Sequence, residues 1–147
     1  MSSTSSSPND AKKPRESDAG RTLLDASALL AVLFEETGAG TVRQALNRGA
    51  VLSSVNASEV VARLQEDGWT AAETSGILVE MGLDIVPFDW ETALLTGLYR
   101  SPTRPFGLGL GDRACLATGR RLGLPVLTAD RAWTKLSLPG VTIRCIR

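Results

Sequence analysis

The sequence contains no histidine among its 147 residues. This absence excludes Ser-His-Asp and Cys-His catalysis, zinc sites that use histidine, and nucleases in which paired histidines act as acid and base. Any strong metal site has to be built from carboxylates, whose oxygen atoms favour hard cations such as Mg²⁺ or Mn²⁺.

Cysteines and long apolar runs are also scarce. Cys115 and Cys145 are the only two cysteines, too few for a disulfide framework, which fits a reducing compartment such as the cytoplasm. No run reaches the roughly 18 apolar residues of a membrane-spanning helix. With 43% hydrophobic and 22% charged residues, the composition is that of one soluble globular domain.

The first 20 residues differ from the rest of the chain. They are rich in serine, mixed in charge and nearly devoid of large apolar side chains. They also lack the apolar segment of a secretory signal. Such a segment cannot offset the entropy of ordering, so we expect a disordered tail over residues 1–20 and one domain over residues 21–147. A start codon assigned too far upstream is an alternative origin for the tail.

Charge is divided unevenly along the chain, although the net charge is zero. Residues 22–96 carry three basic and eleven acidic side chains, whereas residues 97–147 carry nine basic and two acidic ones. A basic half suggests an anionic partner. The two acids within it, Asp112 and Asp130, therefore need an explanation of their own.

Short apolar runs alternate with helical patterns along the chain. Strands are expected at Thr22–Leu24, Val51–Ser53, Leu83–Phe88, Pro125–Leu127 and Val141–Ile143. Helices are expected at Ser27–Phe34, Gly38–Asn47, Asn56–Asp67, Thr70–Met81, Asp89–Tyr99 and Asp112–Leu122, with a short helical turn at Ala132–Leu136 and a loop at 101–111. The alternation predicts an α/β fold, a three-layer α/β/α sandwich with a mainly parallel central sheet.

Four carboxylates occupy the positions where such a fold places its ligands, beyond the carboxyl ends of the strands. Asp25 and Asp130 follow strands, whereas Glu59 and Asp112 lie in the first turns of helices. Each also has an ordinary structural interpretation. Asp25 and Asp112 resemble helix caps, Glu59 completes a capping box with Asn56, and Asp130 fits a turn.

Asp112 is the acid that a simple cap explains least well. Cys115, Leu116, Gly119 and Leu122 follow it at helical spacing, so it lies on the small, apolar stripe that faces inward. A buried carboxylate needs a partner or a metal ion.

Four segments resemble, in order, the motifs of the PIN-domain family, and most closely the VapC-type ribonuclease toxins of type II toxin–antitoxin pairs. They are Thr22–Ala31 (TLLDASALLA), Asn56–Val60 (NASEV), Leu110–Ala117 (LGDRACLA) and Leu127–Trp133 (LTADRAW). The resemblance covers residues 21–147.

This resemblance implies a Mg²⁺- or Mn²⁺-dependent endoribonuclease that leaves a 5′-phosphate and a 3′-hydroxyl. The family's acidic positions fall on Asp25, Glu59, Asp112 and Asp130, with Asp25 and Asp112 expected as direct metal ligands. The other two would act through water or on a second metal ion. The resemblance also implies a homodimer, which the apolar helix at 27–34 would favour, and a small antitoxin that binds across the site.

Ser27 and Thr128 match the small hydroxyl positions of the family. They are expected to orient a carboxylate or a metal-bound water, or to act only as a helix cap and a strand-end hydroxyl. The basic residues nearest the motifs are candidates for RNA binding, although each also fits an ordinary solvated surface: Arg100, Arg104, Arg113, Arg131 and Lys135.

The aromatic residues have two interpretations. Phe106 either stacks on an unpaired base or fills the core. The three tryptophans, Trp69, Trp90 and Trp133, are expected to be packing residues. Two other functions fit the same sequence: a PIN nuclease of RNA maturation or decay, and a non-catalytic α/β module that binds a protein.

Overall fold

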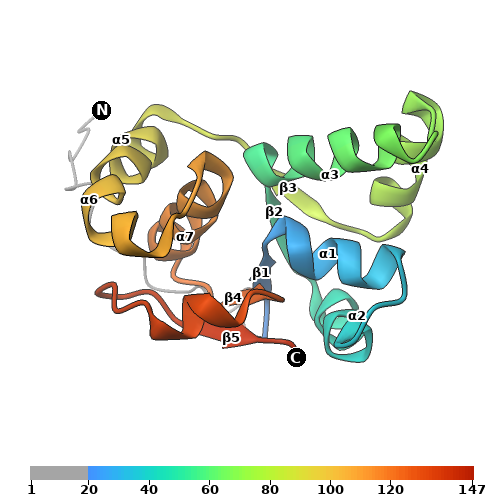
Figure 1. Cartoon of the computed structure of the whole chain (residues 1–147). Coiled ribbons are helices and arrows are strands. Elements are labelled where there is room, and N and C mark those ends of the chain that lie inside the picture. The colour runs from blue at the N-terminus through green and yellow to red at the C-terminus, as the bar shows by residue number, and fades with distance from the viewer. Residues whose placement is uncertain (1–19) are drawn as a thin grey trace, which may run out of the picture.

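A five-stranded parallel sheet lies at the centre of the computed structural model, which describes residues 20–147 (Figure 1). The expected tail, residues 1–20, lies outside the described residues except for Gly20. The strand order is β3-β2-β1-β4-β5, and the strands are β1 (Thr22–Leu24), β2 (Ala50–Ser53), β3 (Asp84–Val86), β4 (Val126–Thr128) and β5 (Ile143–Cys145). All four strand pairs are parallel, so the predicted α/β class is confirmed.

Helices cover both faces of the sheet, as the three-layer prediction requires (Figure 1). Leu24 and Leu127 pack with α1 (Ala26–Leu33), α2 (Ala39–Arg48), α3 (Ser54–Glu66) and α4 (Ala71–Glu80). Leu23 and Val126 pack on the opposite face with α5 (Trp90–Leu98) and α7 (Leu110–Leu122). The three central strands, β1, β2 and β4, are buried on both faces, which explains why apolar residues occupy consecutive positions in each and not only alternate ones.

Two of the expected helix starts are confirmed by their side-chain caps. Thr70 and Glu73 form a reciprocal capping box at the start of α4. Asp89 caps α5 by accepting from the Thr92 backbone N–H at 2.8 Å.

The expected start of α3 at Asn56 is wrong by two residues. The helix begins at Ser54, directly after β2, and Ser53 is its N-cap. Its hydroxyl accepts from the Val55 backbone N–H at 3.2 Å. Asn56 is therefore inside the helix, and its contact with Glu59 joins two side chains on one helical face.

The expected loop at 101–111 is also wrong. Helix α6 (Arg100–Thr103) and the 3₁₀ turn η2 (Arg104–Phe106) fill most of it, and α7 begins at Leu110. The Thr103 hydroxyl is buried and donates to the Tyr99 carbonyl at 2.6 Å, and proline is compatible with the start of a helical turn. Only residues 107–109 remain irregular between η2 and α7.

The C-terminal elements and the aromatic residues need smaller corrections. The helical turn is η3 (Arg131–Lys135), and the last strand is two residues later than expected. Trp133 is buried and Trp69 packs against the core, but Trp90 is 73% exposed. No helix of residues 20–147 is long and apolar enough to cross a bilayer.

Gly119 allows α7 to lie close to the sheet, and this close approach is testable. A Cβ at this position would be 2.6 Å from Cγ2 of Val126, a branched side chain that cannot move aside. We expect Gly119→Ala to lower the free energy of unfolding by about 1–2 kcal/mol, because overpacking outweighs the better helix propensity of alanine. Urea unfolding measures the change.

Gly76 in α4 provides the matched control, since no atom lies within 4 Å of a Cβ built there. Gly76→Ala should raise the free energy of unfolding by up to about 1 kcal/mol. Equal effects of the two substitutions would contradict the close packing of α7 on β4.

Candidate functional site

One hollow of about 220 Å³ lies at the edge of the sheet where β1 and β4 end. All four acids singled out from the sequence line it: Asp25, Glu59, Asp112 and Asp130. Ala26, Ser27, Leu30 and Trp133 complete the lining. The fold therefore brings together carboxylates from four separate segments of the chain.

Asp25 is the most deeply buried of the four acids, with 4% of its surface exposed. Its Oδ1 accepts from the Ser27 hydroxyl at 2.7 Å and from the Ala28 backbone N–H at 2.8 Å. Its Oδ2 accepts from the Thr128 hydroxyl at 2.7 Å. Because each carboxylate oxygen can accept about two hydrogen bonds, Oδ2 keeps one acceptor position that no residue of the described part of the chain fills.

Ser27 and Thr128 connect the ends of β1 and β4 through these same hydroxyls. The Ser27 hydroxyl also accepts from the Ala129 backbone N–H at 3.0 Å. The Thr128 hydroxyl accepts from the Asp130 backbone N–H at 3.0 Å. Each hydroxyl thus fixes the Asp25 carboxylate and the backbone that leads to Asp130.

The other three acids share a pattern, in which one oxygen is held by the protein and the other has no partner within residues 20–147. Glu59 Oε1 accepts from the Asn56 amide at 2.7 Å. Asp112 Oδ2 accepts from the Gly109 backbone N–H at 3.2 Å. Asp130 Oδ1 accepts from the Ala132 backbone N–H at 2.9 Å. Asp112 and Asp130 therefore do cap their helices, but each cap occupies only half of the carboxylate.

The hollow carries negative charge, which the charge of Arg113 offsets only in part at Asp112. None of the four acids forms a salt bridge with a residue of the described chain. The pKa of Asp25 is raised to about 6, chiefly by burial and in smaller part by the Asp112 charge, against the lowering effect of its hydrogen bonds from Thr128, Ser27 and Ala28. Burial also raises the pKa of Asp112, with the Asp130 charge acting in the same direction.

The buried thiol of Cys115 lies close enough to three of these acids to be affected by their charges. Burial raises its pKa well above the usual value, and Asp25, Asp112 and Glu59 add to the shift. The thiol is therefore neutral and unreactive near pH 7. It is not a candidate nucleophile.

The four acids are near one another but do not form a ready-made ligand cage. No three acidic, histidine or cysteine side chains of residues 20–147 converge closely enough on one point to hold a metal ion. Like charges without a cation repel one another, which is consistent with this open arrangement.

The basic candidates divide into exposed and buried side chains. Arg100, Arg104, Arg131 and Lys135 are exposed. Arg113 is buried, and its Nη1 donates to the Thr96 carbonyl at 3.0 Å, which joins α7 to α5. Phe106 is 36% exposed in η2 and does not fill the core.

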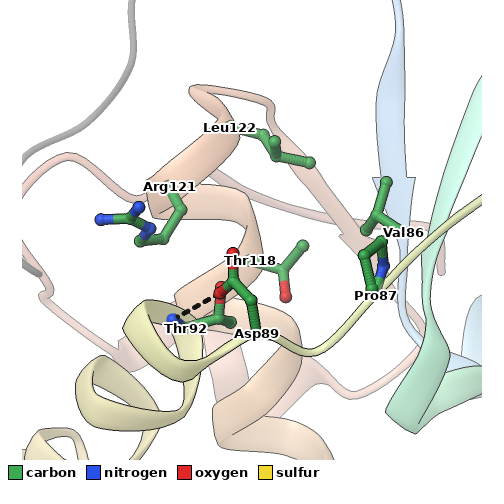
Figure 2. Close-up of a pocket in the computed structure, with 7 residues that line it drawn as sticks. All are labelled: Val86, Pro87, Asp89, Thr92, Thr118, Arg121 and Leu122. Atoms are coloured by element: carbon green, nitrogen blue, oxygen red, sulfur yellow. Dashed lines mark hydrogen bonds between the residues drawn. The ribbon is translucent and has the colours of Figure 1, made fainter. Parts of the chain in front are cut away.

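A second hollow lies between the start of α5 and the end of α7 (Figure 2), and none of the four site acids lines it. Its charged side chains and the Thr118 hydroxyl already have partners in the protein. Asp89 holds the Thr92 backbone N–H, Arg121 forms a salt bridge with Glu91, and Thr118 donates to the Ala114 carbonyl. This hollow belongs to the packing of α5 against α7.

Asn56 and Gly111 are site residues that the sequence interpretation missed. The Asn56 amide nitrogen donates to Glu59 Oε1 and, at 3.0 Å, to the Gly111 carbonyl. The spacing of Asn56 and Glu59 on one helical face was visible in the sequence. The contact with Gly111 was not, because 55 residues separate the two positions.

A family model and solved structures both match the chain. The model of the PIN domain matches residues 22–138. Comparison with curated protein sequences finds no match. The structure resembles VapBC2 from Rickettsia felis bound to a promoter DNA fragment, with a TM-score of 0.65, 14% identity, and 84% of this chain and 97% of that chain covered.

Two further complexes contain the same fold. DNA-bound VapBC from Salmonella typhimurium gives a TM-score of 0.64 at 17% identity, covering 86% of this chain and 98% of that chain. A toxin–antitoxin complex from Klebsiella pneumoniae gives 0.62 at 20% identity, covering 82% and 95%.

The raised pKa of Asp25 predicts a pH-dependent stability in metal-free protein. Because the folded pKa of about 6 exceeds the usual value of 3.8, the folded state holds a proton that the unfolded state has lost, and stability falls as pH rises through this window. From pH 4.5 to 7.5 this carboxyl should cost about 2 kcal/mol. Asp25→Asn removes the titration and should become more stable relative to the parent by that amount over the same range.

Urea unfolding in EDTA at several pH values measures this difference between the two proteins. Comparing them cancels the titration of the acids that do not interact with Asp25. Parallel pH profiles would contradict the raised pKa of Asp25.

Proposed function

The chain belongs to the PIN-domain family, and from this premise we propose that it is a metal-dependent endoribonuclease, the toxin of a toxin–antitoxin pair. The observation that carries the proposal is the hollow at the end of β1 and β4. Four carboxylates line it. Among residues 20–147, each keeps an acceptor position without a partner and none forms a salt bridge.

The carboxylates fit a divalent cation in their donor chemistry. Oxygen ligands from carboxylates favour Mg²⁺ or Mn²⁺, and the chain has no histidine to offer. Asp25 and Asp112 are proposed as direct ligands, and Glu59 and Asp130 as ligands through water or of a second ion. When bound, such a cation lowers the pKa of a water molecule and neutralises charge that develops on the phosphate.

The protein groups around these acids have separate roles in this proposal. Ser27 and Thr128 hold the Asp25 carboxylate in one orientation through hydrogen bonds of 2.7 Å each. The Gly109 backbone N–H holds one oxygen of Asp112 and leaves the other for the cation. Four carboxylates without a cation would repel an anionic phosphodiester, so metal loading has to accompany RNA binding.

Exposed basic side chains would supply affinity for the RNA backbone. Arg100, Arg104, Arg131 and Lys135 are the candidates, whereas Arg113 is assigned to the contact between α7 and α5. Phe106 is exposed enough to stack on an unpaired base.

A small antitoxin that covers the hollow is the proposed protein partner, because the similar structures are toxin–antitoxin complexes. A homodimer is also proposed, from the family resemblance. The apolar side chains of α1 do not support it, because Leu29 is fully buried and Leu30, Leu33 and Phe34 pack against the core.

The metal requirement gives the first test of this function. RNA cleavage should require Mg²⁺ or Mn²⁺ and stop in EDTA, because only a cation can offset the carboxylate charges around the phosphate. The measurement is cleavage of an unstructured RNA in chelated buffer before and after Mg²⁺ is restored. Undiminished cleavage in chelated buffer would contradict the mechanism. A protein that neither binds Mn²⁺ nor cleaves would instead favour the non-catalytic binding module.

Asp112→Asn tests the site directly, because the amide keeps the size and an oxygen for the Gly109 N–H but removes the charge. We expect kcat/KM for RNA cleavage to fall by at least about 100-fold. In EDTA the variant should melt no lower than the parent, because burial and the Asp130 charge disfavour the ionised Asp112. Mg²⁺ should raise its melting temperature less than that of the parent.

Glu73→Gln is the matched control for this substitution. Glu73 occupies the same third helical position in α4 and holds the Thr70 backbone N–H at 2.9 Å, but it does not line the hollow. Its Mg²⁺ response and RNA cleavage should remain parental. If Asp112→Asn behaves like this control, the carboxylate is only a cap.

A further inference from the structure

The Asn56 side chain is buried between two helices, with 1% of its surface exposed. Its amide nitrogen lies 2.7 Å from Glu59 Oε1 and 3.0 Å from the Gly111 carbonyl oxygen. A carboxylate and a backbone carbonyl can only accept, so the donor end of the amide must face them both. Asn56 thus joins α3 to the first turn of α7.

Gly111 provides the surface on which the Glu59 carboxylate lies. A Cβ built on Gly111 would be 2.4 Å from both Oε1 and Oε2 of Glu59. Any side chain at this position would therefore displace the carboxylate. We name the Asn56 amide and the bare Cα of Gly111 the Glu59 seat.

The Glu59 seat restricts the conformation of the Glu59 side chain, which burial does not do. Glu59 is exposed, and a glutamate free in solvent populates many rotamers. In the seat, one oxygen is held, the other has no partner within residues 20–147, and the carboxylate lies beside the residue that precedes Asp112. The seat keeps Glu59 at the hollow.

A purely structural role accounts poorly for Asn56. Its Oδ1 is buried without a hydrogen-bond partner in the described chain, and such an acceptor lowers stability. An apolar residue of similar shape would avoid this cost. The favourable contribution of the Asn56 side chain comes from its hydrogen bonds to two acceptors, Glu59 Oε1 and the Gly111 carbonyl.

We propose that Asn56, together with Gly111, is a positioning residue that holds the Glu59 carboxylate for the divalent cation. This inference rests on the proposed metal-dependent function. Partners that orient a metal ligand typically contribute 10–100-fold to metal affinity or activity. Asn56 touches neither the substrate nor the reacting atoms in this assignment and acts through Glu59.

The test measures Mn²⁺ binding by the free Mn²⁺ signal in electron paramagnetic resonance, alongside RNA cleavage as a function of Mg²⁺ concentration. Asn56→Ala should weaken Mn²⁺ binding by about 10-fold or more and raise the Mg²⁺ concentration for half-maximal cleavage in parallel. Asn56→Leu, which keeps the branched shape without the donor, should do the same and serves if the alanine variant does not fold.

Ser58→Ala is the matched control on the same turn of α3. The Ser58 hydroxyl donates to the Val55 carbonyl at 2.6 Å, and within residues 20–147 it forms no hydrogen bond with the Glu59 carboxylate. This variant should bind Mn²⁺ and cleave RNA like the parent.

A double-mutant cycle separates action through Glu59 from a general loss of structure. In a Glu59→Gln background, Asn56→Ala should cause little further loss of Mn²⁺ affinity or cleavage. Parental Mn²⁺ affinity in both Asn56 variants, or additive losses in the cycle, would overturn the positioning role of Asn56 but leave the proposed metal-dependent function in place. A parent that neither binds Mn²⁺ nor cleaves RNA would overturn the proposed function, and this inference with it.

Discussion

The buried Asp25 carboxylate, at the point where β1 ends beside β4, is the charge on which the geometry of the site depends. It accepts three hydrogen bonds, from Ser27, Ala28 and Thr128. Two of those donors come from one segment and the third from the end of β4, so the carboxylate ties neighbouring strands together. The same hydroxyls then fix the backbone of Ala129 and Asp130. The position of one buried charge therefore sets the position of a second acid.

This arrangement costs stability that the fold has to supply elsewhere. The raised pKa values of Asp25 and Asp112 mean that their ionised forms are less favourable in the folded protein than in the unfolded chain. No basic residue of residues 20–147 forms a salt bridge with either acid, and the charge of Arg113 only partly offsets the cost at Asp112. Apolar strands buried on both faces provide the compensating free energy. Such local strain is characteristic of sites kept for function.

Sequence patterns predicted the features that depend on residues close together in the chain. The caps at Thr70 and Asp89 and the acids at the strand ends follow from neighbouring residues and from the rule for parallel sheets. Tertiary contacts decided the rest. Arg113 looked like an RNA ligand, but it is buried against the Thr96 carbonyl, a contact that spans 17 residues. Trp90 was expected to pack, yet its place at the first turn of α5 leaves it exposed.

The site divides into a part fixed by the sheet and a part fixed between helix layers. Asp25 directly follows β1 and Thr128 ends the neighbouring strand β4, and the Asp25 backbone N–H donates to the Leu127 carbonyl, so the two residues move together. Glu59 lies in α3 and Asp112 lies in α7. These two helices pack on opposite faces of the sheet, so their side chains can meet only beyond its edge (Figure 1). A shift of one layer against the other would leave the Asp25 hydrogen bonds intact but separate Glu59 from Asp112. The contact between the layers, from the Asn56 amide to the Gly111 carbonyl, therefore governs whether the two halves form one site.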